Sequence, residues 1–342
     1  MAFFNHNFTF IAGLRSRIFL NFGTLEDILA LRFFGLFRIS MSGESMSKKT
    51  IAYVMSTNYA GSHFLSLLLG SNSRAMHIGE IKHLRKKKIN PKRTLCYICK
   101  DASSCVMTRG ITPENIDAVY DIIFSNISAV KPGVNTLVDT SKKTFWSERF
   151  LGNEKYDLKF IHLIRDPRAI VRRYIINNKT LIERLKQRWK VIRHYFNMAH
   201  TLLFAEQSIV YLYQWLKENI EISDFIETHR LNATVVTYRD LAKNTHEELK
   251  RLTEWLGLKY EPSQLKYFNF EHHGTQKPEY EWVKSSKRTD HIDLRWQTFL
   301  SEKTASNIVN DGLVDDYLSR LGLAFTEDGI TKKINLIERK AV

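Results

Sequence analysis

Short runs of aliphatic and β-branched residues alternate along this chain with segments of helical periodicity. Three of the runs are Ile51–Met55, Lys159–Ile164 and Ala233–Thr237, and each is followed by polar or turn-forming residues. The segments Phe64–Leu69 and Leu241–Leu256, which come after two of them, carry apolar residues at the spacing of amphipathic helices. Strands that alternate with helices in this way predict an α/β fold with a parallel sheet.

The middle of the chain contributes further elements of both kinds. Thr136–Asp139 is predicted to be a short strand. The Arg-Asp-Pro sequence after Ile164 ends the strand Lys159–Ile164, and a helix is predicted to follow over Arg168–Tyr174. Between residues 180 and 219 the apolar positions predict two helices whose apolar sides face the core. These positions are Leu185, Trp189, Ile192, Phe196, Ile209, Leu212, Trp215 and Leu216.

The first 49 residues differ in composition from the rest. They form an extension rich in Phe and Leu that ends in the polar tract Ser40–Lys49, which has the composition of a linker. We expect the folded domain over residues 50–325 and a C-terminal tail over 326–342. Charged residues interrupt the longest apolar stretch, so the sequence predicts no bilayer-spanning helix of about 20 residues. The apolar extension is a candidate surface for packing on a second chain.

The charge balance indicates the kind of partner. The chain has 51 Lys and Arg against 36 acidic residues, a formal charge of +15, which favours a polyanionic partner through long-range attraction. Nucleic acid, anionic lipid, a sulfated or phosphorylated acceptor and a nucleotide all meet that condition. The three cysteines are too few and too clustered for a disulfide framework, and the N-terminus lacks the layout of a secretory signal, so we expect a soluble cytoplasmic protein.

The turn after the first strand has the residues of an anion-binding loop. Ser56–Phe64 contains Ser, Thr, Asn and Gly before a helix, and such a turn presents free backbone N–H groups and the positive end of the helix dipole. The Ser62 hydroxyl and the His63 ring can add hydrogen bonds. A Walker loop requires a Lys directly before the helical Ser or Thr, and none stands here, so a nucleoside triphosphatase or a nucleotide kinase is disfavoured.

Several segments of the chain also resemble motifs of a known family. Ala60–Ser71 followed by His77–Glu80 resembles the 5'-phosphosulfate loop of the sulfotransferase superfamily that uses 3'-phosphoadenosine 5'-phosphosulfate (PAPS). The likeness is greatest to its bacterial-type and tyrosylprotein branches, and it spans roughly residues 50 to 323. The later segments, similar to the family's motifs in the same order, are Val138–Lys142, Phe160–Arg172, Thr237–Leu241, Trp255–Leu258 and Ile292–Trp296.

The resemblance implies a P-loop-like parallel sheet flanked by helices, and transfer of a sulfuryl group from PAPS as co-substrate to a hydroxyl or amine acceptor. It implies that Glu80 is the base, that Lys142 neutralises the leaving group and that Ser62 and His63 hold the sulfonate. We therefore expect Glu80, Lys142 and His63 to be catalytic, and we assign no metal ligand. The residues expected to bind the nucleotide are Tyr59, Ala60, Gly61, Ser62, His63, Phe64, Arg165, Arg173, Tyr238, Ser286, Lys287 and Arg288.

Two positions depart from the family pattern. Tyr59 stands where the family loop has Arg or Lys, and a phenol does not supply that positive charge. Arg173 stands where the family's 3'-phosphate motif has Ser, and a guanidinium with enough room binds phosphate better than a hydroxyl does. Protonated His63 is a candidate replacement for the missing loop cation. The alternative to an unusual active site is an inactive relative that binds a polyanion through its basic loop.

Two of the predicted side chains also have an ordinary interpretation. Arg165 directly follows a buried strand, where its guanidinium can bind a phosphate at the carboxyl edge of the sheet. It can equally form a salt bridge with Asp166 or Asp139. Glu80 is either a base that owes its efficiency to its position or a solvated charge in the stretch Glu80–His83.

The segment after Glu80 has a cysteine cluster and a basic run. Cys96, Cys99 and Cys105 with His83 would form a structural zinc site, but the set is incomplete by spacing, and a cluster that stabilises the loop is the simpler interpretation. The basic run Leu84–Arg93 lacks the interleaved aromatic residues that stack on bases, so we expect no nucleic-acid partner. Because the run lies beside Glu80 in the sequence, in an enzyme it would line the acceptor cleft and select acidic acceptors. The acceptor stays open among small metabolites, lipids, sugars and peptide tyrosine.

Overall fold

Five parallel strands form the centre of the fold. The structure is a computed structural model that describes residues 48–85, 96, 98–99, 104–274 and 292–333. The four strand pairings are all parallel, and the spatial order is β2-β3-β1-β4-β5, which confirms the predicted α/β fold with a parallel sheet. The strands are β1 (Lys49–Ser56), β2 (Ala75–Gly79), β3 (Thr136–Lys142), β4 (Tyr156–Ile164) and β5 (Ala233–Thr237).

The sequence pattern did not indicate β2. This strand is short, ends in Gly79 and contains His77, a residue that is more often found outside the core. All of its residues are buried, and the ring Nδ1 of His77 lies 2.8 Å from the Ser66 hydroxyl oxygen in the neighbouring helix. Because that helix supplies a hydrogen-bond partner, a polar ring can occupy an otherwise apolar strand.

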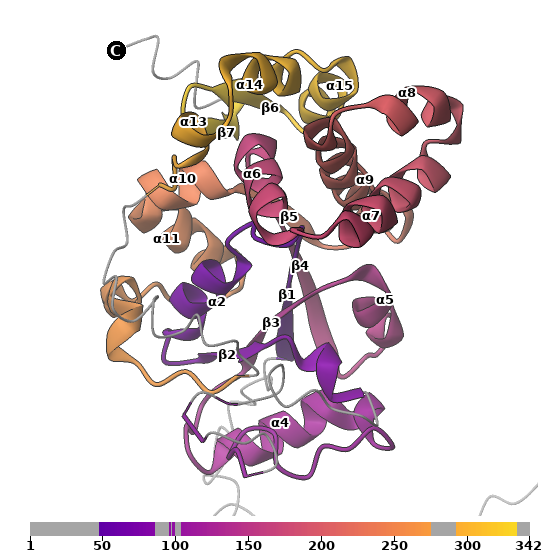
Figure 1. The fold of residues 1–342 in the computed structure, drawn as a ribbon. Helices are drawn as coiled ribbons and strands as arrows, with labels where there is room; N and C mark the ends of the chain where they lie inside the picture. The colour runs from indigo at the N-terminus through magenta and orange to yellow at the C-terminus, as the bar shows by residue number, and fades with distance from the viewer. Residues whose placement is uncertain (1–47, 86–95, 97, 100–103, 275–291, 334–342) are drawn as a thin grey trace, which may run out of the picture. The chain divides into compact units, whose positions relative to one another are not determined.

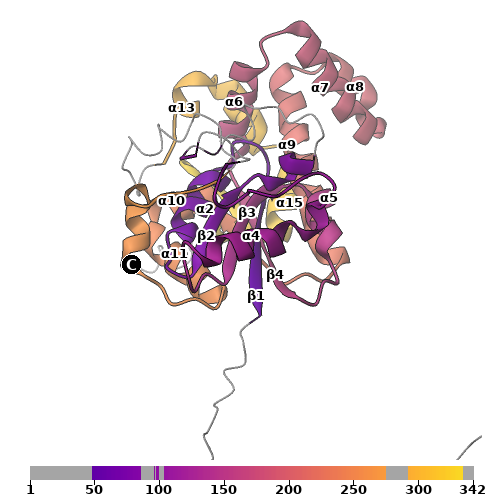
Figure 2. The same ribbon diagram turned by 90° about the horizontal axis from the view of Figure 1, so that it is seen from below.

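Helices cover both faces of the sheet, as Figures 1 and 2 show. Alternate residues of β1 face opposite ways, so Ala52 and Val54 pack with α2 (Ser62–Gly70) and α11 (Thr245–Trp255). Ile51, Tyr53 and Met55 pack instead with α4 (Val119–Ser128) and α5 (Thr144–Ser147). A strand covered on both faces has a continuous apolar sequence, which is why β1 could be predicted from the sequence.

A third apolar cluster adjoins the end of β4 and is mainly helical. Trp215 in this cluster is fully buried, and its indole N–H donates to the carbonyl oxygen of Arg165 at 3.0 Å. This bond ties a long helix to the first residue after β4. The helices of this part are α6 (Pro167–Asn177), α7 (Leu181–His194), α8 (Ala199–Phe204), α9 (Gln207–Thr228), α13 (Trp296–Phe299), α14 (Glu302–Val309) and α15 (Gly312–Arg320).

The prediction of two core-facing helices over residues 180–219 was partly wrong. The region forms three helices, α7, α8 and the first half of α9. Leu185, Trp189 and Phe196 are 46%, 59% and 81% exposed, whereas Ile192 and Trp215 are buried as expected. The described part of the chain packs against only one side of α7, so the other apolar side of this helix lies at the surface.

Two further boundaries differ from the prediction. The segment Leu241–Leu256 is not one helix, because Asn244 has a non-helical backbone (φ −121°, ψ 46°) between α10 (Tyr238–Lys243) and α11. The fold also continues beyond residue 325, since β6 (Leu323–Thr326) and β7 (Gly329–Lys332) form an antiparallel pair. Thr331 in β7 donates to the buried Asp240 carboxylate at 2.6 Å, which holds this hairpin on α10. Among the described helices, none is both long and apolar enough to cross a membrane.

Candidate active site

Four predicted site residues lie where strands end at the carboxyl edge of the sheet. Glu80 follows β2, Lys142 is the last residue of β3, Arg165 follows β4 and Tyr238 follows β5. The strands end at a common level, since Met55 near the end of β1 is paired with Lys142. This edge is where open parallel sheets bind their ligands. The structure therefore brings the two implied motifs, the loop after β1 and the Arg after β4, to one side of the sheet.

The loop between β1 and α2 has an unusual backbone. Tyr59 (φ 67°) and Gly61 (φ 98°) both adopt left-handed conformations, which for a non-glycine residue such as Tyr59 costs about 1 kcal/mol or more. A Cβ atom on Gly61 would lie only 2.7 Å from Cδ2 of Tyr238, so the absence of a side chain lets the loop pack on that ring. Gly61 is the N-cap of α2 and offers no side chain to its first N–H groups, which leaves them to an anion.

Arg165 joins this loop to two later segments of the chain. Its Nη1 donates to the Tyr59 carbonyl at 2.8 Å and its Nη2 to Asp293 Oδ2 at 2.9 Å. The guanidinium carbon lies 4.2 Å from the centroid of the Tyr238 ring. The Nε atom is buried, and within the described part of the chain it has no hydrogen-bond partner. A buried donor of a charged group is costly when unpaired, so this N–H is available for a ligand.

The alternative interpretation of Arg165 as the partner of Asp166 or Asp139 was wrong. Asp166 pairs with Arg168 at 2.6 Å, and Asp139 is buried in a separate hydrogen-bond network. Asp293, the acid that does hold Arg165, comes from a segment whose resemblance to the family was visible, but its role was missed. Only the folded chain brings it to the end of β4.

Asp293 is ionised in this arrangement. Burial raises the pKa of its carboxyl, but the hydrogen bonds and charges of Arg295 and Arg165 outweigh burial and hold the pKa well below its usual value. The resulting carboxylate orients the Arg165 guanidinium.

The two departures from the family pattern lie against each other. The guanidinium carbon of Arg173 is 5.2 Å from the centroid of the Tyr59 ring, within the range in which a cation is attracted by an aromatic ring. The Tyr59 ring also lies edge-on to Tyr174, with centroids 5.7 Å apart. Arg173 thus brings a positive charge to the loop position where the family has Arg or Lys and this chain has Tyr.

Three basic side chains hold the Glu80 carboxylate. Lys142 Nζ donates to Oε1 at 2.5 Å and Lys82 Nζ donates to Oε2 at 2.6 Å, while His83 Nε2 lies 3.2 Å from Oε2. The Glu80 side chain is 29% exposed, so the interpretation as a freely solvated charge was wrong. Burial raises the pKa of Glu80, but attraction to Lys142, the hydrogen bond of His83 and attraction to Lys82 outweigh burial and lower the pKa far below its usual value. The group is a carboxylate at neutral pH.

The backbone at Lys142 is part of this geometry. Its φ of 64° is left-handed, and the register of β3 against β1 shifts just before it. The register of β3 against β2 shifts as well, next to Gly79. Irregularities of this kind re-aim side chains at the ends of strands, and left-handed non-glycine residues are concentrated at functional sites. The ammonium of Lys142 reaches Glu80 from this strained position.

His63 does not carry the positive charge that was expected of it. Burial and, to a smaller extent, the nearby charges of Lys142 and His272 lower its pKa to about 4, although Glu80 raises it. The ring lies edge-on to that of His77, with centroids 5.2 Å apart. At neutral pH the imidazole is uncharged in this structure, so it can form a hydrogen bond with an anion but cannot neutralise one. Arg173 and Arg165 bring positive charge to the loop instead.

The remaining predicted nucleotide-binding residues fall into two groups. Ala60 is fully buried in the apolar core, Ser62 is buried in the first turn of α2, and the Phe64 ring packs edge-on against Tyr267 at 5.7 Å. Ala60 and Ser62 are buried and support the loop, whereas Phe64 is only partly buried. Ser286, Lys287 and Arg288 lie outside the described residues, as do residues 86–95 of the basic run.

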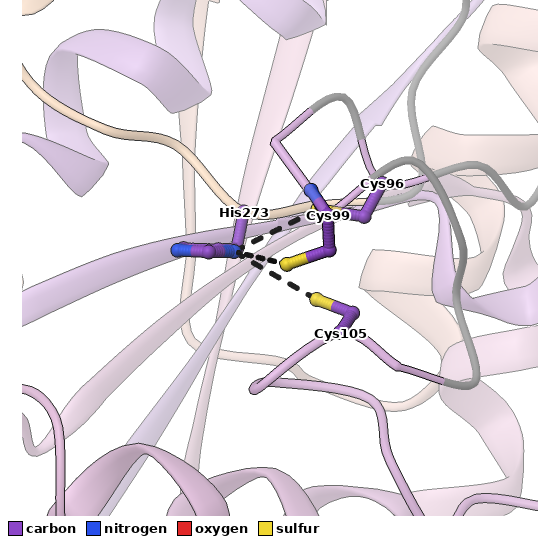
Figure 3. Close-up of side chains that lie close together, drawn as sticks. All are labelled: Cys96, Cys99, Cys105 and His273. Atoms are coloured by element: carbon purple, nitrogen blue, oxygen red, sulfur yellow. Dashed lines mark hydrogen bonds between the residues drawn. The ribbon is translucent and has the colours of Figure 1, made fainter.

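The three cysteines converge on one histidine (Figure 3). Nδ1 of His273 lies 3.7, 3.4 and 3.8 Å from the Sγ atoms of Cys96, Cys99 and Cys105. The four atoms all lie within 4.8 Å of one another. His83, which the sequence offered as the fourth member, contacts Glu80 instead. His273 was missed because 168 residues separate it from Cys105, and spacing gives no signal over that distance.

Several solved structures are similar to this chain. The sulfotransferase domain from the curacin biosynthetic pathway is 19% identical, with 76% of this chain and 96% of that chain covered and a TM-score of 0.48. The sulfotransferase domain of the Synechococcus PCC 7002 olefin synthase is 15% identical, with 77% and 96% covered and a TM-score of 0.43. A mouse sulfotransferase complexed with PAP is 11% identical, with 80% and 87% covered and a TM-score of 0.39.

Comparisons with curated proteins and with models of protein families give different results. No curated protein matches the chain. The model described as the sulfotransferase family matches residues 57–262, which is more than half of the chain. The matched range contains the loop after β1 and the residues that follow β2, β4 and β5, which are the parts that form the candidate site. The chain that carries this site therefore belongs to the sulfotransferase family.

Proposed function

We propose that this sulfotransferase takes the sulfuryl group from PAPS and transfers it in line to a hydroxyl or amine acceptor, with Glu80 as the general base. Family membership supports sulfuryl transfer in general. The observation that carries the finer proposal is the pair formed by Glu80 and Lys142, 2.5 Å apart at the carboxyl edge of the sheet. A carboxylate and an ammonium are the base and the cation that this transfer requires.

The site has the groups that a doubly phosphorylated nucleotide needs. The start of α2 offers N–H groups to the 5'-phosphosulfate, and Arg173 beside Tyr59 adds a positive charge there. Arg165 offers its buried, unpaired Nε to the 3'-phosphate, while Asp293 and the Tyr59 carbonyl hold the guanidinium in orientation. The residues present therefore fit PAPS.

Lys142 has two successive roles in this proposal. In this structure its ammonium stabilises the Glu80 anion and makes the carboxylate a weak base. An anionic donor competes for the same ammonium, and when Lys142 turns toward the donor the proton affinity of Glu80 rises. Lys82 and His83 remain on the other carboxylate oxygen and keep the base in place. Donor binding would thus activate the base.

PAPS supplies the sulfuryl group and a leaving phosphate. Glu80 Oε1 accepts the proton of the acceptor as the acceptor oxygen or nitrogen bonds to sulfur. Lys142 neutralises the charge that develops on the leaving oxygen as its bond to sulfur breaks. Neutral His63 donates a hydrogen bond to the sulfonate. The proton ends on Glu80 and the negative charge on the nucleotide product, so atoms and charge balance.

The test is calorimetric titration of the full chain with 3'-phosphoadenosine 5'-phosphate (PAP), the desulfated product, with ATP as the comparison ligand. The Arg165→Ala variant loses the charged contacts assigned to the 3'-phosphate, worth about 1.5–3 kcal/mol, so its PAP affinity should fall roughly 10- to 150-fold. Arg320→Ala is the matched control, because Arg320 is a surface residue paired with Asp224 at 3.5 Å. Circular dichroism establishes that each variant is folded.

Strong binding of PAP, weak binding of ATP and a loss confined to Arg165→Ala would support the proposal. No binding of PAP by the wild-type chain would refute it. The inactive, polyanion-binding relative would then become the preferred interpretation.

A further inference from the structure

We propose that Cys96, Cys99, Cys105 and His273 bind one zinc ion. The four side chains come from two segments of the chain and point toward one another (Figure 3). Three sulfurs and one ring nitrogen form one of the common ligand sets of structural zinc sites, and the pair Cys96 and Cys99 has the usual two-residue separation. This inference concerns residues that the proposed transfer of sulfuryl groups does not use.

The distances between the His273 nitrogen and the three sulfurs match those of a tetrahedral site. With Zn–S bonds of about 2.3 Å and a Zn–N bond of about 2.0–2.1 Å, tetrahedral angles place the nitrogen about 3.6 Å from each sulfur. The observed separations from His273 Nδ1 are 3.4, 3.7 and 3.8 Å. A chain of ordinary thiol hydrogen bonds would not require all three sulfurs to surround a single nitrogen. The cluster therefore has the dimensions of a metal site.

A disulfide is a poorer explanation of the cluster. An odd number of cysteines leaves one thiol over, and the three cysteines are free in this structure. The cluster also includes a histidine, which a disulfide does not need. Soft thiolate ligands with one imidazole in tetrahedral arrangement favour zinc among the common divalent metals.

The surroundings suit buried thiolates. Cys96 and Cys105 are 2% and 0% exposed, in an apolar cluster that also contains Met107. The backbone N–H of Cys99 is 3.5 Å from the Cys96 sulfur, and the backbone of Met107 hydrogen-bonds the Cys105 sulfur. Such N–H groups offset the negative charge that three thiolates leave around one zinc ion. Four protein ligands leave no open position, so the site is structural.

The zinc ion would join the loop after Glu80 to the segment after the helical turn Pro262–Asn269. Ile81 and Leu84, which directly follow Glu80, belong to the same apolar cluster as Cys96 and Cys105. The ion would therefore hold in place the polypeptide that carries the proposed base.

His272, the residue before the proposed ligand His273, is also held in place. Its Nε2 lies 2.9 Å from the Tyr267 carbonyl oxygen, and its ring centroid is 6.2 Å from that of His77 in β2. The segment that supplies the histidine ligand is thus packed against the core as well.

The first measurement is the metal content of the full chain, purified under reducing conditions without an affinity tag, by plasma mass spectrometry. We expect about one zinc per chain. Cys99→Ser and His273→Asn each remove one ligand and should lose most of the metal, whereas the control His246→Asn changes an exposed histidine outside the cluster and should keep it. Thiol titration of the unfolded protein should find three free thiols.

Wild-type protein makes the inference testable even if the variants fail to fold. Modification of its thiols with a mercurial should release zinc to a colorimetric chelator, and exchange with Co²⁺ should produce the visible absorption of a tetrahedral thiolate complex. No zinc after purification and no uptake of added Zn²⁺ by the reduced chain would overturn the inference, as would iron in its place or a disulfide. These readouts use neither donor nor acceptor, so they are independent of the proposed function.

Discussion

Replacement of Glu80 by Gln is the most direct test of the proposed base. The amide keeps the size of the side chain and can still accept hydrogen bonds, but it cannot take a proton. General-base catalysis typically contributes a factor of 10²–10⁴. Because three basic groups surround the carboxylate, its basicity is low, and we expect its contribution to the rate to lie near the lower end of this range. The predicted loss in kcat is about 100-fold, or about 2.7 kcal/mol at 1.36 kcal/mol per tenfold change.

The assay is transfer of label from radiolabelled PAPS to phenols, primary alcohols and primary amines, with the best acceptor used for all variants. PAP affinity, measured by calorimetry, should not fall, because Glu80 is not assigned to the nucleotide and its replacement frees Lys142 for the phosphate. Glu254→Gln is the matched control, since Glu254 is an exposed residue of α11. A loss in kcat of less than about fivefold in Glu80→Gln would refute the assignment of Glu80 as base.

The same variant has a predicted effect on stability that needs no acceptor. Glu80 has a lowered pKa, so its ion pairs stabilise the folded state above the unfolded pKa of about 4.3 and lose that effect as the pH falls toward the folded pKa. The partly exposed pairs should contribute about 1–3 kcal/mol. In urea unfolding, wild type should exceed Glu80→Gln by this amount at pH 7, and the difference should shrink below about pH 4.5. A difference that grows on acidification would contradict the assigned shift.

Three further predictions concern the fold around the site. Gly61→Ala should lower the free energy of unfolding by about 1–3 kcal/mol and weaken PAP binding, because it places a Cβ 2.7 Å from the Tyr238 ring on a residue with a left-handed φ. Unchanged PAP binding would contradict the packing of the loop between β1 and α2 on the Tyr238 ring. Asp139→Asn should cost about 1–3 kcal/mol in urea unfolding, because an amide NH₂ replaces a buried acceptor, and a neutral result would show that the network is not intact. Trp215→Ala should cost about 3–5 kcal/mol in thermal unfolding, whereas Trp189→Ala should stay within about 0.5 kcal/mol, and equal effects would contradict the burial of only the first.

The local pattern of the chain was enough to predict most strands and the approximate position of the site. Phe160–Ile164 is buried throughout and Ala233–Thr237 is partly or fully buried, so their mostly apolar sequences indicate strands directly. Lys142 and Arg165 could be placed at one edge of the sheet because parallel strands that alternate with helices all end on the same side. Each of these inferences uses neighbouring residues and one rule of topology.

Packing between helices could not be read in the same way. The apolar side of α7 has the periodicity of a core helix, yet Trp189 and Phe196 are exposed. Periodicity shows which residues share a side of a helix, but the presence of a neighbour on that side depends on where the rest of the chain lies. β2 was missed because it contains a polar residue, His77, which is compatible with the core only because Ser66 lies beside it.

The sequence by itself determined the α/β sheet, a candidate anion-binding loop, and Glu80, Lys142 and Arg165 as candidate site residues, because contiguous residues and their resemblance to the family's motifs carry these inferences. Only the tertiary structure decided which distant side chains contact the candidate site and the cysteine cluster: Arg173 lies on Tyr59, Asp293 on Arg165 and His273 on the cysteines. Those partners lie far away in the sequence, and their approach follows from the packing of whole helices and loops. Sequence spacing carries no information about contacts that arise in this way.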